Sequence, residues 1–295
     1  PMETEVLRWF QHVADGVTVT EVADIHLVSQ PAVSRGLARL EDEVGTPLLA
    51  RAGRVLRLTE AGAAFKAHLD QALFHLDDGI AAVGELLDPE RGTVSVAFET
   101  SLGLWLVPGL IAGFRRQHPG VRFNLEQTHD LRTWEDAVEW RLDAAFTSQR
   151  PTDPDLTWEH LVSLPLALAV PPGHPCAKSE SVSLATAQDE RFIMVGGDWQ
   201  LRRVTQMLCQ AAGFNPSISF EGEDITVVRA FVANGLGVAV VPVTQAEARY
   251  RRTPEVLVPL SDLGASLDVG LVWSHVRRAL PSAQLFRDYV LAARA

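Results

Sequence analysis

The spacing of apolar residues divides the chain into a helical first third and a remainder in which strands alternate with helices. Residues 3–14 place Val6, Phe10 and Val13 on one side, which predicts an amphipathic helix. From residue 59 to about 88, apolar residues recur in steps of three and four and predict a helix on the order of 40 Å long. Its apolar positions are Phe65, Leu69, Ala72, Leu76, Ile80, Val83 and Leu87. The neighbouring sequence is too short to cover this stripe, which therefore predicts pairing with a second copy of the chain.

Two shorter helices are predicted within residues 20–43, joined by a tight turn at residues 27–29. Thr20 is expected to cap the first helix, because its hydroxyl can accept a free backbone N–H. Ser29 is expected to cap the second helix. Pro31 fits the first turn of that helix, where no intrahelical N–H is needed.

The second of these helices has an apolar face and a basic face. Val33, Leu37 and Leu40 recur at i, i+4 and i+7 and form the apolar face. The residues on the opposite face are Gln30, Ser34, Arg35, Ala38 and Arg39. Such a helix fits a DNA major groove, where guanidinium groups bond to guanine edges or to phosphates. An ordinary helical hairpin with solvated arginines is the alternative interpretation.

The residues after this helix pair predict a short basic hairpin. Leu56 and Leu58 alternate with polar residues in the manner of a strand, and the turn at residues 51–54 carries two arginines. These arginines are placed to lie against phosphates or to enter the minor groove. Helices and hairpin together predict a winged helix-turn-helix over residues 1–58, followed by a linker helix over residues 59–88.

From Gly92 onward, strand-like runs alternate with helical runs. The strand-like runs are residues 93–98, 121–127, 142–148, 164–172, 191–196, 217–222, 237–242 and 267–273. This alternation predicts parallel sheets covered by helices, with residues 131–141 forming one of the helices. Two α/β lobes joined by two crossing strands create a cleft at the carboxyl ends of the strands, where open α/β sheets bind ligands.

Charge changes this picture only locally. The chain of 295 residues has a formal net charge of −11 and a pI of about 5.3, which at first sight argues against nucleic acid. Within residues 30–58, however, five arginines outnumber three acidic residues, among them Glu41 and Glu43, which are interpreted as solvated helix charge. A local excess of two positive charges predicts weak binding by one copy. Two or more copies acting together are therefore expected.

The remaining composition restricts compartment and chemistry. No apolar run approaches the ~20 residues of a membrane span, and the first ten residues resemble no export signal, so a cytoplasmic protein is expected. Cys176 and Cys209 are expected to be reduced thiols, with a redox-sensing disulfide as the alternative. Because the common catalytic, phosphate-binding and zinc motifs are absent and the histidines are dispersed, we expect neither an enzyme nor a metal site.

Four segments carry a family resemblance: SQPAVSR (29–35), RLEDEVGTPLLAR (39–51), LTEAG (58–62) and GLGVAVVP (235–242). With them the chain resembles the LysR-type transcriptional regulators over essentially its whole length. LDPERGTVSVAFETSLG (87–103) and FEGED (220–224) are similar to the branch that contains the glutamate-synthase activator.

The resemblance implies a type II periplasmic-binding-protein fold for an effector domain over residues 92–295. Lobe I is expected to comprise residues 92–163 and 269–295, and lobe II residues 164–268. The resemblance also implies a homotetramer, built as a dimer of dimers on inverted-repeat promoter DNA, with RNA polymerase as a further candidate partner and with no cofactor. A solute-binding protein of a transport system is the alternative that the cleft fold alone would allow.

Site residues follow from the resemblance and from local chemistry. The resemblance assigns DNA contacts to Gln30, Pro31, Ser34, Arg35 and Arg54, and the basic pattern adds Arg39 and Arg51. The resemblance assigns the effector cleft to Thr100, Ser101, Thr128, Thr147, Asp198, Trp199, Gln200, Arg202 and Glu223.

Local chemistry supports some of these cleft residues. Thr100 and Ser101 are expected to begin a helix directly after a strand, where free N–H groups favour a carboxylate effector. Both are also ordinary capping residues. Arg202 either adds charge complementarity or lies at the surface, and Glu223 and Asp224 are expected to cap the next helix, with Glu223 also a candidate ligand contact.

Two residues depart from the family pattern. Gly36 stands where a polar residue, frequently Gln, is common, so the loss of a base contact is expected, together with a helix cost of about 1 kcal/mol relative to Ala. Leu49 replaces the usual Phe at the start of the hairpin, which is expected to change packing alone.

Overall fold

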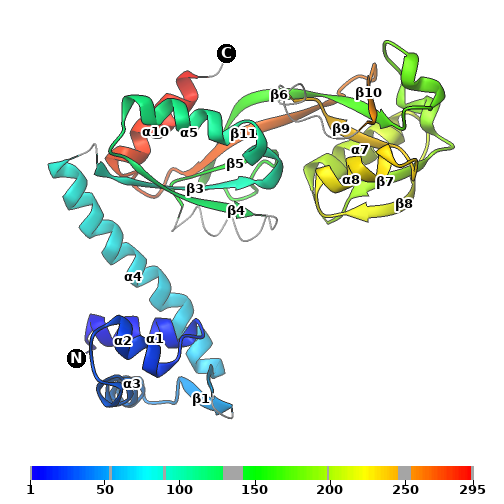
Figure 1. Cartoon of the computed structure of the whole chain (residues 1–295). Coiled ribbons are helices and arrows are strands. Elements are labelled where there is room, and N and C mark those ends of the chain that lie inside the picture. Colours follow the sequence, from blue (N-terminus) through cyan, green and yellow to red (C-terminus); the bar gives the residue numbers. More distant parts are fainter. Residues whose placement is uncertain are drawn as a thin grey trace. The chain divides into compact units, whose positions relative to one another are not determined.

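A computed structural model describes residues 2–52, 55–88, 91–128, 142–197, 199–244 and 254–293. The chain divides into two compact units, an N-terminal unit over Pro1–Val83 and a C-terminal unit over Gly84–Ala295 (Figure 1). The predicted helix over residues 131–141 and the site residues Arg54 and Asp198 lie outside the described residues.

The N-terminal unit is a winged helix-turn-helix, as the sequence predicted. It contains α1 (Thr4–Ala14), α2 (Val19–Ile25), α3 (Gln30–Val44) and the antiparallel pair β1 (Leu49–Ala52) and β2 (Val55–Leu58). The same unit holds most of α4 (Glu60–Leu87). Phe10, Val33 and Leu48 are fully buried, and Leu69 and Leu73 of α4 complete this core. Three helices, the wing and the linker helix therefore share one hydrophobic core.

The cap of α2 differs from the prediction. Thr18, not Thr20, is the N-cap residue: its hydroxyl accepts the Glu21 N–H at 3.2 Å, and the Glu21 carboxylate accepts the Thr18 N–H at 2.8 Å. This reciprocal capping box satisfies two free donors. Ser29 precedes α3 as its N-cap residue, but its side chain makes no cap hydrogen bond.

Gly36 lies on the buried face of α3, so the expected loss of a base contact was the wrong interpretation. A Cβ atom at Gly36 would stand 2.8 Å from Cζ3 of Trp9 and 3.3 Å from a methyl group of Val6. Real Cβ atoms essentially never come as close as 2.8 Å to another atom, so the Trp9 ring would have to shift. The packing of α1 against α3 therefore favours glycine at this position.

The linker helix α4 begins as predicted, with Thr59 as its capping residue. The Thr59 hydroxyl accepts the Gly62 N–H at 2.9 Å and donates to the Pro47 carbonyl at 2.8 Å. Along the apolar stripe of α4, Leu69 and Leu73 are buried, but the described apolar residues that follow them are not. Leu76, Ile80 and Val83 remain 44%, 65% and 61% exposed. The outer half of the stripe is thus left uncovered by its own chain.

Lobe I is built around β3 (Thr93–Glu99), which pairs in parallel with β4 (Arg122–Thr128) and β5 (Ala144–Thr147). Within the described ranges, the strand order of the sheet is β10 (Val256–Pro259), β6 (Leu156–Val170), β11 (Ser266–Ser274), β5, β3 and β4, with β9 (Ala239–Pro242) also paired to β6. The helices α5 (Val107–Gln117) and α10 (Pro281–Ala292) pack their rings Phe114 and Phe286 together at a centroid distance of 5.2 Å. Both rings are fully buried in the lobe I core.

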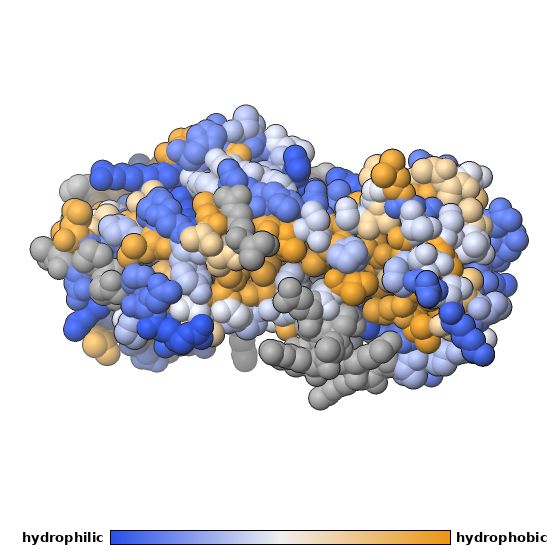
Figure 2. All heavy atoms as spheres, turned by 90° about the horizontal axis from the view of Figure 1, so that it is seen from above, coloured by the Kyte–Doolittle hydropathy of each residue, from blue (hydrophilic) through white to orange (hydrophobic). Residues whose placement is uncertain are grey.

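Two long strands, β6 and β11, run antiparallel between the lobes (Figure 1). Both crossing strands were predicted, but β6 begins at Leu156 rather than at residue 164. In lobe II, β6 also pairs with β9 (Ala239–Pro242) and β10 (Val256–Pro259), and β7 (Arg191–Val195) pairs with β8 (Ser217–Gly222). The described part of lobe II contains the helices α7 (Gln200–Ala211) and α8 (Ile225–Ala233) and short 3-10 helices at Pro175–Lys178 and Leu184–Ala187. Figure 2 shows apolar patches between polar residues on one face of the molecule.

The segment after β3 is the main departure from the predicted elements in lobe I. A helix was expected to begin at Thr100 and Ser101, directly after the strand. The chain instead forms a short 3-10 helix, η2 (Thr100–Leu104), before α5 begins at Val107. A five-residue 3-10 helix has a smaller dipole than a long α-helix, because only a few aligned peptide units contribute to it. The physical argument for an anion at Thr100 and Ser101 is therefore weaker than the sequence predicted, and a carboxylate effector stays a prediction.

Candidate functional site

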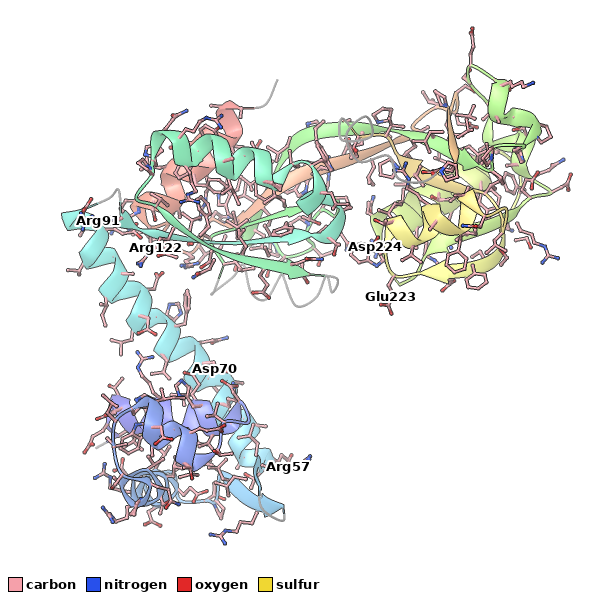
Figure 3. All side chains as sticks on the ribbon, viewed as in Figure 1. Arg57, Asp70, Arg91, Arg122, Glu223 and Asp224 are labelled. Atoms are coloured by element: carbon pink, nitrogen blue, oxygen red, sulfur yellow. The ribbon has the colours of Figure 1, made fainter. Side chains whose placement is uncertain are left out.

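The exposed face of α3 carries the predicted DNA contacts. Gln30, Pro31, Ser34, Arg35 and Arg39 are all exposed. Gln30 and Ser34 line a groove of about 530 Å³ together with Arg51 of β1. Figure 3 shows Arg57 extending outward from the wing. The placement fits a major-groove helix beside a basic wing, and the individual contacts stay predictions.

Two acidic residues bear on this surface. Glu3 holds the Arg39 guanidinium at 3.0 Å in an exposed ion pair, which is a weak interaction. Glu41 is more than the solvated charge that its sequence context predicted. Its Oε1 accepts the N–H groups of Leu48 and Leu49 at 2.8 and 2.9 Å. Glu41 thereby fixes the start of the wing to α3, and the spacing within one helix carried no signal for this contact.

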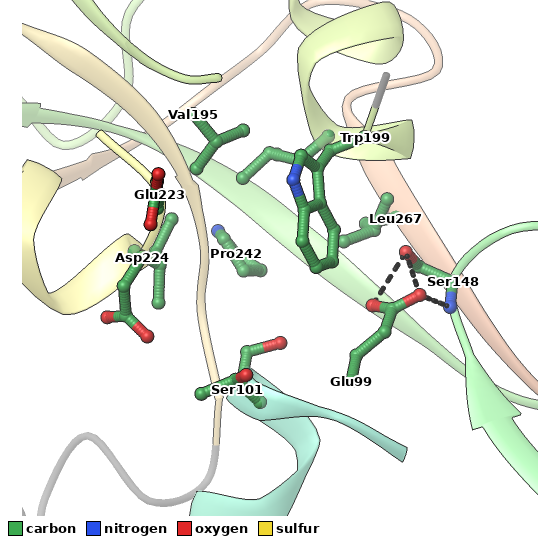
Figure 4. Close-up of a pocket in the computed structure, with 12 residues that line it drawn as sticks. Glu99, Ser101, Ser148, Val195, Trp199, Glu223, Asp224, Pro242 and Leu267 are labelled. Carbon is green, nitrogen blue, oxygen red and sulfur yellow. Dashed lines mark hydrogen bonds between the residues drawn. The ribbon is translucent and has the colours of Figure 1, made fainter. Parts of the chain in front are cut away.

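The C-terminal unit contains a pocket between the two lobes, with about 60 Å³ of space that water molecules can enter (Figure 4). Lobe I lines it with Glu99, Thr100, Ser101 and Ser148. The remaining walls are Val195, Trp199, Leu201, Glu223, Asp224, Ile225, Pro242 and Leu267. Of the predicted effector residues, Thr100, Ser101, Trp199 and Glu223 therefore line the pocket.

Glu99 is a pocket residue that sequence reasoning missed. Glu99 is the last residue of β3 and is 4% exposed. Oε1 accepts the Thr147 hydroxyl at 2.6 Å and the Ser148 N–H at 2.7 Å, and the Ser148 hydroxyl lies 3.0 Å from Oε2. Burial raises the pKa of the Glu99 carboxyl above its ordinary value, and hydrogen bonds from Thr147, Ser148 and Gln149 partly offset the rise. The available signal was a carboxylate at the C-terminal end of a parallel strand.

Thr147 and Thr128 lie beside the pocket lining but are not part of it. Thr147 is 2% exposed, and its hydroxyl is turned to Glu99. Thr128 ends β4, where it pairs with Glu99 in the parallel register. Gln127, its neighbour on β4, donates from Nε2 to the Thr100 hydroxyl at 2.9 Å. These three residues thus pair with or hydrogen-bond to lining residues of lobe I without lining the pocket themselves.

The site residues predicted at the start of α7 differ in whether they line the pocket. Trp199, the N-cap residue, lines the pocket, whereas Gln200 and Arg202 are not among the lining residues. The Arg202 guanidinium donates to the Val195 carbonyl at 3.1 Å and to the Glu221 carboxylate at 2.7 Å. It is thereby bound to the β7–β8 pair of lobe II.

Glu223 and Asp224 differ from each other although the sequence predicts a cap for both. Asp224 is the N-cap residue of α8, and its carboxylate accepts the Thr226 N–H at 2.6 Å. Glu223 is exposed and caps nothing. Both lie at the edge of lobe II nearest lobe I, across the pocket from Glu99 (Figures 3 and 4).

Cys176 and Cys209 are both free. Burial, with a smaller contribution from Asp262, raises the pKa of the Cys209 thiol to about 11, so it stays protonated at neutral pH. Across the described ranges there is no metal-ligating group of three or more His, Cys, Asp or Glu side chains. Likewise, none of the described helices has the length and apolarity to cross a membrane.

Two family models match the chain. The model described as "Bacterial regulatory helix-turn-helix protein, lysR family" covers residues 4–63, and "LysR substrate binding domain" covers residues 87–295. GltC of Bacillus subtilis (strain 168), described as a transcriptional dual regulator, is 35% identical over 98% of this chain and 97% of its own. YybE of the same strain, an uncharacterized HTH-type transcriptional regulator, is 33% identical over 99% of each chain.

Solved structures agree with the fold. Full-length CbnR in complex with its target DNA has a TM-score of 0.79 at 22% identity and covers 99% of each chain. The winged helix-turn-helix and the two-lobed domain define a DNA-binding transcriptional regulator with an effector-binding domain, not an enzyme. The chain belongs to the LysR family of transcriptional regulators, as its sequence motifs indicated. The alternative of a transport solute-binding protein is not favoured, because residues 4–63 match the DNA-binding module.

Proposed function

We propose that this regulator binds promoter DNA as an oligomer and that a small molecule in the lobe I–lobe II pocket changes this binding. The observation that carries the proposal is the pocket itself: its walls come from both lobes, with Glu99 on one and Glu223 on the other. A ligand that touches both walls binds more tightly when the lobes approach each other. It therefore shifts the domain toward that arrangement.

The uncovered stripe of α4 supports self-association. Leu76, Ile80 and Val83 follow the heptad-like spacing of a paired helix and remain largely exposed. We propose that α4 pairs with its copy and that two such dimers form a tetramer on DNA. This assembly also overcomes the small basic excess of one α3 and wing, since each added copy raises the effective affinity for a site with repeated sequences.

The remaining partners follow from this role. Chromosomal DNA in bacteria lies in the cytoplasm, and we propose that location for the regulator. Rearrangement of DNA-bound dimers changes the bend and the accessibility of the promoter. We therefore propose RNA polymerase as the downstream partner, reached either by direct contact or through the shape of the DNA.

A gel-shift titration with the upstream region of the protein's own gene tests the proposal. Arg35→Ala should lower site-specific binding by about tenfold or more, because an exposed guanidinium on the recognition helix is lost. Thr100→Val, in the pocket wall, should leave the ligand-free DNA complex intact and alter its response to ligand. Equal effects of both substitutions on DNA binding and on ligand response would contradict this division of labour.

A further inference from the structure

We propose that the effector is a small organic cation, a molecule with an amine or guanidinium group on a short apolar body. This inference rests on the proposed function, in which the lobe I–lobe II pocket is the effector site. It goes beyond that function by assigning the charge of the ligand.

The charges on the pocket walls have one sign. Glu99, Glu223 and Asp224 line the pocket, and no Lys, Arg or His within the described ranges does so. Glu99 belongs to lobe I, whereas Glu223 and Asp224 face it from lobe II (Figure 4). The formal net charge of the chain, −11, has the same sign. A cation is therefore attracted both by the pocket and by the field of the whole protein.

Glu99 is the strongest single element of this argument. It is a buried carboxylate whose described partners, Thr147, Ser148 and the Gln149 backbone, are neutral donors, and no cationic side chain among the described residues pairs with it. A buried carboxylate without a counter-charge is costly, and burial already raises its pKa. A ligand ammonium or guanidinium group would supply the missing charge and keep the carboxyl ionised.

The other walls fit the body of such a ligand. Val195, Leu201, Ile225, Pro242 and Leu267 are apolar. Trp199 adds an indole ring, and aromatic faces attract cations. The space that water molecules can enter is only about 60 Å³, which favours a small molecule over a peptide or a nucleotide.

A carboxylate effector fits these walls less well. The physical argument for one relied on an α-helix beginning at Thr100 and Ser101, and this segment is the 3-10 helix η2. The nearby candidate cation, Arg202, is bound to Glu221 and to the Val195 carbonyl and does not line the pocket. An anion would therefore meet three carboxylates with no lining positive charge among the described residues.

Three five-carbon probes test the sign of the charge on the full-length protein: pentane-1,5-diamine, glutarate and pentane-1,5-diol. Calorimetric titration should show saturable binding of the diamine and no binding of glutarate or of the diol at the same concentrations. Glu99→Gln should weaken diamine binding by about 30-fold or more, because it removes one partner of a buried charge pair. Glu223→Gln should also weaken it, and this exposed residue is not needed for folding.

The matched control is Glu180→Gln, which makes the same chemical change at an exposed position that does not line the pocket. It should bind the diamine as tightly as the wild type. Glutarate binding that Glu99→Gln abolishes or strengthens would overturn the inference. So would diamine binding unchanged in both pocket variants, or no binding of any probe at millimolar concentration.

Gel shifts with the same probes separate this inference from the proposed function. If glutarate binds in the pocket and alters the DNA complex, the cation inference fails and the proposed function stands. If the diamine binds through Glu99 but leaves the DNA complex unchanged, the charge preference of the pocket is as inferred, but the proposed regulation through this pocket fails and the diamine is not an effector.

Discussion

In the substitution Gly36→Ala, the helix preference of the residue and its tertiary contact have opposite effects on stability. Alanine in place of glycine within a helix is worth about 0.5–1 kcal/mol in favour of the variant. In this fold, however, the new Cβ atom would stand 2.8 Å from Cζ3 of Trp9, a ring that is 7% exposed and held in the core. Overpacking of a core typically costs about 1–3 kcal/mol. The expected net result is a loss of about 1 kcal/mol in the stability of the N-terminal unit.

Gly109→Ala in α5 is the matched control. Gly109 is exposed within a helix, and a Cβ atom there would meet nothing within 4 Å. Helix preference alone predicts stabilisation at both positions. The structure predicts that alanine stabilises the protein at Gly109 and destabilises it at Gly36.

Native-state hydrogen exchange of the full chain can measure each variant in its own helix, with α3 amides reporting on Gly36 and α5 amides on Gly109. Amides of α3 should exchange faster in Gly36→Ala, and amides of α5 should exchange more slowly in Gly109→Ala. If Gly36→Ala protects α3 as much as Gly109→Ala protects α5, the packing argument is refuted. Gly36→Gln should be more destabilising still and should not raise DNA affinity.

Three further outcomes are expected. Ile80→Glu should convert the oligomer to monomers in light scattering, since it places a charge on the exposed stripe of α4, whereas Leu263→Glu in an exposed turn of lobe II should not. Folding raises the pKa of Glu99, so its contribution to stability is present at low pH and is lost as pH rises through the folded pKa. The melting temperature of Glu99→Gln relative to wild type should therefore increase as pH is raised from about 4, and a decrease would contradict the assignment. Iodoacetamide at pH 8 should alkylate Cys176 but not Cys209, whose pKa of about 11 and full burial protect it, as mass spectrometry of the native protein can check.

Most of the elements could be predicted because their patterns are local. The stripe of α4 and its cap at Thr59, the crossing strands β6 and β11, and the exposed basic face of α3 all follow from periods and capping chemistry within a few residues. The family motifs are short local segments as well. Boundaries shifted where two local signals competed, as at Thr18 and Thr20.

The candidate site could be predicted only in part. Thr100, Ser101, Trp199 and Glu223 line the pocket, but the partners that define its chemistry are distant in sequence. Glu99 meets Thr147 and Ser148 across 48 and 49 positions. Glu41 reaches the wing, and Arg202 turns to Glu221, through contacts that no helical period encodes.

Local order in the chain was thus sufficient to define a DNA-reading module, a linker helix and a two-lobed domain, because helices and strands obey short-range rules. The packing of Trp9 against Gly36 and the burial of Glu99 arose only when remote segments were brought together. Those contacts depend on the whole fold, because burial and charge are properties of a residue's surroundings and not of its neighbours along the chain.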